Sequence, residues 1–501
     1  MKLRTQFRMG SVAVALLTLL GGLQLFAADE KPKKTIDRAA QLAEGKMLFE
    51  RDWSTAGPLK GARGDGLGPM YNDVSCVACH NLGGVGGAGP NKNNVNLLSR
   101  GRRPVTKVST RRRSRSSKQF GKVHPGFGTG SSTLILHQFG EGPVGSAGDY
   151  EKWRNSLLGE GKYRLSLVHP LRRIQRVWLQ LTQRNTPALF GAGIIDSIPD
   201  SLLIETAEIQ EKQFPEISGR VPQTGTGAVG RFGWRGQTGT LHEFVLGACA
   251  VELGLQVPGN TIQTKYPLKR GQEGDIRVRE PFKVRDPRLG GGTDTDLDLT
   301  DEQCKSLTAY CASLSAPVPV AGAHLQVSLD VYKGHKLFNK IGCAACHVKD
   351  MGPAKDVFSD LLLHDMGKKL ADPLPATPEI TDETAPSFSS SYYGESAIEF
   401  LATITTNIRQ EWRTPPLWGV RDSAPYMHDG RAYSLETAIR MHEGEASRSG
   451  KRFRALTSKQ REQLLTFLNS LAAPGGGPVS RRFGRSGFGA GFFSTPVELE
   501  D

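Results

Sequence analysis

Residues 341–350 are "IGCAACHVKD", a stretch in which two cysteines stand three positions apart and a histidine follows at once. The same pattern, Cys-x-x-Cys-His, occurs far upstream as "CVACH" at residues 76–80. Cysteines at this spacing serve as a redox-active thiol pair, as half of a zinc site or as the covalent attachment site of a haem. The choice among these three decides the fold, because large cofactors would supply much of the core that side chains otherwise build.

The surroundings of both patterns favour haem. A structural zinc site needs two more ligands nearby, and neither pattern has a second cysteine or histidine pair at the usual spacing. A thioredoxin-type pair lies in a βαβ context, which the sequence does not predict here. A haem c needs only the five residues, because the cysteines form thioethers and the histidine binds the iron. The sequence therefore predicts two covalently bound haem c groups.

Each predicted haem has its own three residues, two for attachment and one proximal ligand. They are Cys76, Cys79 and His80 for haem one, and Cys343, Cys346 and His347 for haem two.

An amphipathic helix is expected before each pattern, over residues 37–52 and 325–341. The two segments share a glycine followed by Leu-Phe, in "GKMLF" (45–49) and "GHKLF" (334–338). The similarity indicates an internal repeat.

A second helix is expected to close each unit, over residues 299–317 and 456–474. Thr300 and Ser458 are the N-cap candidates, and a proline follows each helix. Residues 317–325 have the composition of a linker between the two units.

The repeat predicts a mostly α fold of two cytochrome-c-like domains with long loops, packed about an inter-domain seam. The N-terminal domain would span 29–317 and the C-terminal domain 325–474. The long middle of the first unit is glycine-rich and shows few strand signals, so we expect mainly loops and short helices there. A low apolar content of 38%, with 59 glycines and 29 prolines, is also typical of a loop-rich chain.

The chain begins with the pattern of a secretory signal peptide, predicted over residues 1–28. A basic start precedes an apolar run over 10–26, which is short for a membrane span. Since no other long apolar run follows, we expect a periplasmic or secreted protein without a membrane span after cleavage. An uncleaved anchor is the alternative.

Charge is unevenly placed along the chain, whose net formal charge is +14. Residues 100–122 hold ten lysines or arginines and no acid. We interpret this segment as a solvated insertion rather than a nucleic-acid site, because blocks of like charge usually stay unfolded and export argues against DNA. Attraction of an acidic electron donor or of a cell-surface polyanion is a further use. The tail, 475–501, is expected to be flexible.

Three cysteines lie outside the haem patterns. Cys304 and Cys311 are about 10 Å apart on one helix by helical rise, too far to form a disulfide with each other. Either one of them pairs with Cys249, or all three are buried free thiols.

The sixth ligand of each iron decides whether the haem only transfers electrons or can also bind a small oxidant. For haem two, a helix is expected from Ser434 to Gly444, and His442 shares its apolar face with Leu435. His442 is therefore the predicted ligand, with Met441 as the alternative. A surface histidine near a helix end is the other interpretation of His442.

The other histidines of the chain are weaker candidates for an iron ligand. His428 and His364 are expected to make local hydrogen bonds rather than to bind iron. No histidine or methionine occurs between residues 81 and 123. Haem one is therefore the expected open site, where a small oxidant could bind; the next histidines along the chain are His124, His137 and His169.

Four further stretches support a family resemblance. They are "RNTPALFGAGIIDSIPD" (184–200), "GRFGWRGQTGTLHEF" (230–244), "SDLLLHDMG" (359–367) and "RTPPLWGVRDSAPYMHDGRAYSLETAIRMHEGEA" (413–446). Together with the two haem patterns they resemble the di-haem cytochrome c peroxidase superfamily, most closely its di-haem oxidoreductase branch. The resemblance covers most of residues 40–475.

The resemblance implies roles for two more residues. In that superfamily the C-terminal haem takes electrons from a donor and the N-terminal haem reduces hydrogen peroxide. Trp234 matches a tryptophan that lies between the haems, and Glu252 matches a glutamate that acts as acid and base near the peroxidatic iron. A general acid suits O–O cleavage, since a proton must reach the leaving oxygen. An ordinary exposed glutamate is the alternative for Glu252.

The chain also departs from the family pattern. His442 stands where the peroxidases usually have methionine and the related branch has histidine, which implies a lower potential for haem two. Phe244 replaces a glutamine near the peroxidatic haem, and the loop histidine of those enzymes is absent. The resemblance further implies a calcium ion between the domains, with oxygens from Asn185, Ser423 and Pro425.

The predicted function is reduction of hydrogen peroxide to water with electrons from a small redox-protein donor. Two alternatives stay open: an electron-transfer di-haem cytochrome without peroxidase activity, and a haem oxidase acting on a protein or organic substrate. No nucleic-acid partner is expected, and a homodimer is one possible oligomeric state.

Overall fold

The structure, a computed structural model, describes residues 37–55, 57–62, 64, 66–68, 70–100, 133–140, 147–158, 172–174, 177–224, 227–258, 297–372 and 408–477. The predicted signal peptide lies outside these ranges, as do the basic insertion after Arg100 and the tail from residue 478 onward. Within the described ranges, no helix is both long enough and apolar enough to cross a membrane.

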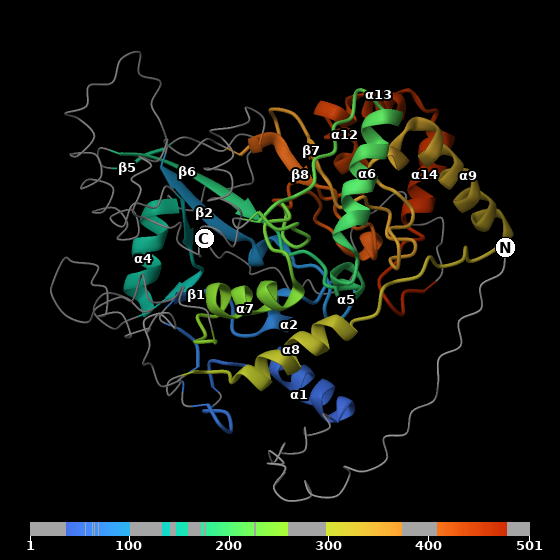
Figure 1. Ribbon diagram of the computed structural model, residues 1–501. Coiled ribbons are helices and arrows are strands. Elements are labelled where there is room, and N and C mark those ends of the chain that lie inside the picture. Colours follow the sequence, from blue (N-terminus) through green and yellow to red (C-terminus); the bar gives the residue numbers. More distant parts are fainter. Residues whose placement is uncertain are drawn as a thin grey trace, which may run out of the picture. The chain divides into compact units, whose positions relative to one another are not determined.

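The predicted helices around both haem patterns are confirmed. α1 (Arg38–Glu50) and α8 (Asp301–Ser313) belong to the first unit. α9 (Leu325–Ile341) and α14 (Ser458–Leu468) belong to the second, where they pack on each other (Figure 1).

Capping boxes begin both closing helices. The Thr300 hydroxyl accepts from the Gln303 amide, and the Gln303 side chain returns to the Thr300 amide. Thr457 and Gln460 form the same pair at the start of α14. The N-cap of α14 is thus Thr457, one residue before the predicted Ser458, because the glutamine three positions after Thr457 completes the box.

The glycine of each repeat lies where the leading helix meets the closing helix. A Cβ on Gly45 would collide with the Ser306 carbonyl in α8, and one on Gly334 with the Gln463 carbonyl in α14. The repeat seen in the sequence is therefore a repeat of one tight helix contact, which only glycine permits.

The middle of the first unit also contains a four-stranded antiparallel sheet, which the expectation of mainly loops and short helices there did not include. Its strand order is β3-β2-β6-β5. The strands are β2 (Val95–Arg100), β3 (Thr133–Leu136), β5 (Arg172–Ile174) and β6 (Val177–Arg184) (Figure 1). Two small strand pairs join β1 (Met70–Tyr71) to β4 (Phe139–Gly140) and β7 (Leu363–Asp365) to β8 (Glu411–Arg413).

Shorter helices and turns complete the described elements. The α-helices are α2 (Cys76–Cys79), α4 (Ala147–Leu158), α5 (Ala192–Asp196), α6 (Asp200–Gln213), α7 (Leu241–Glu252), α12 (Leu435–Arg440) and α13 (Ser447–Ala455). The 3₁₀ turns are η1 (Asn91–Asn93), η6 (Cys343–Ala345), η7 (Ile408–Gln410), η8 (Val420–Asp422) and η9 (Gly444–Ala446). Helix remains the dominant regular structure, which confirms the mostly α prediction.

The largest buried cluster among the described residues joins both predicted domains, including Phe49 and Leu307 from the first and Leu361 and Trp418 from the second. A separate cluster around Phe338 packs α9, α13 and α14 together. The division into two cytochrome-c-like domains stays a prediction.

Candidate functional site

Each Cys-x-x-Cys-His pattern lines its own cavity. The upstream cavity, of about 110 Å³, contains Cys76, Cys79 and His80 in its wall. The downstream cavity, of about 300 Å³, contains Cys343, Cys346 and His347. The two cavities share a stretch of wall formed by Asn185, Thr186, Pro187, Leu189, Gly233, Trp234 and Phe244.

Local structure orients His80 in the upstream cavity. Ser75 caps the short helix α2 by accepting from the Ala78 amide. His80 follows, and its Nδ1 lies 3.2 Å from the Gly87 carbonyl oxygen. A proton on Nδ1 leaves Nε2 with a free lone pair, the usual state of a metal-bound imidazole. Burial lowers the pKa of His80 to about 4, so the neutral, ligating form dominates at pH 7.

Two histidines face each other in the downstream cavity. His347 directs Nδ1 to the Phe358 carbonyl at 2.9 Å, and His442 directs Nδ1 to the Ala438 carbonyl at 2.8 Å. Burial lowers the pKa of both side chains, that of His347 to about 4. Both imidazoles therefore present a neutral Nε2.

The spacing of these two rings fits one metal ion between them. Their centroids are 6.5 Å apart. Metal–imidazole bonds are about 2 Å long, and two such bonds plus two ring radii add up to roughly 6 Å. Cysteines, proximal histidine and an opposed second histidine together fit a haem whose iron has two histidine ligands.

His442 reaches this position in a way that differs from the prediction. α12 ends at Arg440 with Met441 as its C-cap, so the helix does not extend to Gly444. The Ala438 carbonyl accepts from the Met441 amide and also lies 2.8 Å from His442 Nδ1. Of the two predicted candidates, His442 lines the downstream cavity, whereas Met441 is not among the described residues of its wall.

The Glu252 carboxyl lies buried at the end of α7 on the wall of the upstream cavity. Its Oε2 accepts from Asn72 Nδ2 at 2.6 Å. Its Oε1 is buried and has no hydrogen-bond partner among the described residues. Burial raises the pKa of Glu252 to about 7, although the Asn72 hydrogen bond acts in the opposite direction. An ordinary exposed glutamate, the alternative from the sequence, does not describe this residue.

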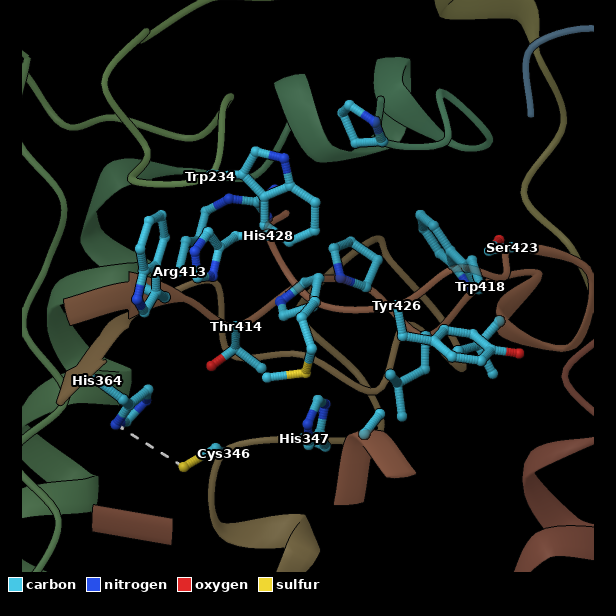
Figure 2. Close-up of a pocket in the computed structure, with 18 of the residues that line it drawn as sticks. Trp234, Cys346, His347, His364, Arg413, Thr414, Trp418, Ser423, Tyr426 and His428 are labelled. Atoms are coloured by element: carbon cyan, nitrogen blue, oxygen red, sulfur yellow. Dashed lines mark hydrogen bonds between the residues drawn. The ribbon is translucent and has the colours of Figure 1, made fainter. Parts of the chain in front are cut away.

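Trp234 lies in the wall shared by the two cavities. Its indole Nε1 donates to the Asn185 carbonyl at 2.8 Å. Figure 2 shows Trp234 across the downstream cavity from His347 and Cys346. Phe244 also belongs to the shared wall and stacks on Phe232.

His364 forms a buried bridge between two carboxylates. Its Nε2 lies 2.9 Å from Asp360 and its Nδ1 2.7 Å from Glu445. Burial opposes the charged form, but Asp360 raises the pKa of His364 well above its usual range. Figure 2 marks its contact with Cys346, at 3.8 Å. The bridge connects the segment of His442 to the haem-two anchor, since the Asp360 amide donates to the Cys346 carbonyl.

His428 differs from the expected turn residue. Its ring stacks on Trp412 with centroids 3.6 Å apart, and its backbone carbonyl accepts from the Asn185 amide. Arg235 lies over the same indole at 3.9 Å and also binds Asp372. No pattern in the sequence connected these residues.

The three further cysteines are buried free thiols in the structure, in agreement with the second alternative. Cys249 and Cys311 line the upstream cavity.

The predicted calcium ligands all line the downstream cavity. The Asn185 carbonyl accepts from Trp234, its side-chain amide donates to the Gly89 carbonyl, and Ser423 donates to the Gly419 carbonyl. These contacts do not test calcium binding by Asn185, Ser423 and Pro425, which stays a prediction.

Comparison with known proteins shows what parts of the chain are similar to. A family model described as "Di-haem oxidoreductase, putative peroxidase" matches residues 400–471, a segment that includes His442. Methylamine utilization protein MauG of Methylorubrum extorquens is 28% identical over 158 residues, which are 30% of this chain and 37% of that protein. The chain thus matches little more than a third of that relative's length. The two findings confirm the predicted relationship to the di-haem peroxidase-type superfamily, a class that implies haem cofactors.

Three solved structures show weak likeness. Hydrazine synthase of Kuenenia stuttgartiensis has a TM-score of 0.26 at 16% identity, over 58% of this chain and 73% of that one. A MauG-like protein associated with microbial copper homeostasis has a TM-score of 0.26 at 16% identity, over 55% and 90%. A variant of the diheme peroxidase BthA from Burkholderia thailandensis has a TM-score of 0.22 at 17% identity, over 34% and 50%. Likenesses of this size carry no conclusion about the activity of this chain.

Proposed function

We propose that this chain is a periplasmic or secreted di-haem c-type oxidoreductase that reduces hydrogen peroxide to water with electrons from a small redox protein. The observation that carries the proposal is the Glu252 carboxyl. It is buried in the wall of the upstream cavity, and its Oε1 has no hydrogen-bond partner among the described residues.

Glu252 would act as the proton donor. Reduction of one peroxide breaks the O–O bond, takes up two electrons and two protons, and releases two waters. A carboxyl with a pKa of about 7 holds its proton in half of the molecules at neutral pH and can pass it to the leaving oxygen. Asn72 binds Oε2, which leaves Oε1 without a hydrogen-bond partner among the described residues.

The two haem sites would have different roles because the residues that hold the haems differ. Cys76, Cys79 and His80 would hold a haem that supplies the redox chemistry for peroxide. At the downstream site His347 and His442 would both hold the haem, which favours electron transfer over binding of a substrate. Trp234, in the wall common to both cavities, offers an aromatic side chain on the path between them.

The test is peroxide turnover by the purified di-haem protein with a reduced redox protein as the electron source. We expect consumption of two electrons per peroxide and loss of activity in Glu252→Gln. Glu243→Gln, on the same helix α7, is the matched control and should retain activity. Two outcomes would contradict the proposal: no turnover, which would favour the electron-transfer cytochrome, or turnover only with an oxidisable organic or protein substrate, which would favour the oxidase.

A further inference from the structure

One wall of the downstream cavity is formed by α13. Ser449 and Gly450 of this helix line the cavity. Gly450 packs so closely on the segment of the sixth ligand that a Cβ there would come to 2.9 Å from the His442 carbonyl oxygen. Phe453 is fully buried in the cluster around Phe338 and anchors the helix from within.

The same helix touches the anchor of haem two. Arg452 donates to the Ile341 carbonyl at 3.4 Å, two residues before Cys343. A Cβ on Gly342 would meet the Ser449 hydroxyl at 2.9 Å. α13 therefore contacts both the segment that leads to Cys343 and the segment that contains His442.

The outward face of α13 is strongly basic. Four of its nine residues are exposed cations, and it contains no acid. They are Arg448, Lys451, Arg452 and Arg454. Arg448 forms an ion pair with Glu216 of the chain. Arg452 and Arg454 lie in the last turn, where the helix dipole favours cations, but four cations within one short helix also repel each other.

We propose that the basic face of α13 is the docking surface for an acidic small redox protein that delivers electrons to the downstream site. This inference rests on the proposed function, in which that site accepts electrons. One electron would leave the reduced centre of the donor and enter the haem held by His347 and His442, with no proton or atom transferred.

Position and charge together favour this partner over other anions. The thickness of a single helix, with glycine at its inner contact, separates the basic face from the downstream cavity. Electron-transfer complexes are small and short-lived, so complementary charge mainly raises their rate of formation. An acidic donor bound here would lie next to the site that its electron must reach.

The test measures reduction of the oxidised di-haem protein without peroxide, by stopped flow. The acidic probe is a reduced plant-type [2Fe–2S] ferredoxin, and the cationic probe is hexaammineruthenium(II). The test variant is the double charge reversal Lys451→Glu with Arg454→Glu. The matched control, Lys46→Glu with Lys60→Glu, makes the same change in net charge on α1 and on the loop before the first haem pattern.

We expect the rate with ferredoxin to fall with rising salt, and to fall about tenfold or more in the α13 variant, with little change in the control. The ruthenium probe should reduce the α13 variant at least as fast as the wild type, which shows that the haem sites are intact. Equal loss in both variants, or an unchanged rate with ferredoxin, would overturn the inference. So would binding of an anionic oligonucleotide to α13 that leaves the ferredoxin rate unchanged. Because the assay contains no peroxide, its result can be interpreted even if the protein does not reduce peroxide.

Discussion

His347 and His442 face each other across the downstream cavity with ring centroids 6.5 Å apart. Each holds its Nδ1 against a backbone carbonyl, from Phe358 and from Ala438. These contacts fix both rings with Nε2 free. The arrangement brings together His347, which the haem pattern predicts, and His442, which lies 95 positions further along the sequence.

Replacing the distal histidine tests this pair. His442→Ala should convert the downstream haem from a low-spin to a high-spin state, because it removes one of two strong axial ligands. Electronic absorption and EPR spectra of the oxidised protein measure the change. Met441→Ala, the neighbouring control, should leave the spectra unchanged; the reverse result would transfer the ligand role to methionine.

The Glu252 carboxyl predicts a pH dependence of activity. Its proton is available below a pKa of about 7, so peroxide reduction should slow as pH rises through that value. Glu252→Gln should lower the rate by about a hundredfold or more and remove this limb of the profile. A wild-type profile that is flat between pH 6 and pH 8, or a variant that keeps the limb, would exclude Glu252 as the donor.

The same carboxyl predicts a pH dependence of stability. Its pKa in the folded state is about 7, against 4.5 as the ordinary value, so the folded protein binds the proton more tightly than the unfolded chain does. The resulting stabilisation is present below pH 4.5 and is lost as pH rises towards 7. Denaturant unfolding of the wild type should show this loss relative to Glu252→Gln. If the unfolding free energies of the two proteins changed with pH in the same way, that result would contradict the assigned pKa.

Glu445 tests the bridge at His364. Glu445→Ala removes one of two carboxylates from a buried imidazolium and should cost about 3 kcal/mol of unfolding free energy. It should also produce a fraction of high-spin downstream haem, since the segment with His442 loses its connection to the haem-two anchor. Glu443→Ala breaks the exposed pair with Lys369 and should cost less than about 1 kcal/mol. Equal effects from the two variants would refute the positioning role.

The tight helix contacts of the repeat predict equivalent defects in both units. Gly45→Ala and Gly334→Ala each place a methyl group against a backbone carbonyl of the closing helix. Each should therefore destabilise the protein by about 1–3 kcal/mol. Gly57 has open space around its Cα, and Gly57→Ala is the control for chemical denaturation. Stability equal to the control in either variant would show that its helix pair can shift without cost.

The helices of the repeat could be predicted because their signals are local. α9 has the predicted bounds, since the apolar spacing over 325–341 and Gly342 at its end lie within one segment. The sheet could not be predicted, because β2 and β3 are separated by more than thirty residues and only tertiary packing brings them together. A signal did exist in β6, where Val177, Leu179 and Leu181 alternate with other residues.

The candidate site likewise contains residues that the sequence predicts and residues that it does not. The haem anchors follow from five adjacent residues, and His442 from its spacing along a predicted helix, although that helix is shorter than expected. The network of Asp372 with Arg184 and Arg235 joins residues more than a hundred positions apart. Such buried pairs depend on packing, which no local pattern encodes.

The most direct test of the central claim, two unequal haem sites with the upstream one open to oxidant, is EPR of the fully oxidised protein before and after addition of peroxide. We predict two haem signals of similar intensity, one low-spin from the site of His347 and His442 and one high-spin or weakly ligated from the site of His80. Reduction of the downstream haem beforehand should make the upstream signal respond to one equivalent of peroxide. Two low-spin signals that ignore peroxide in every redox state would contradict the account.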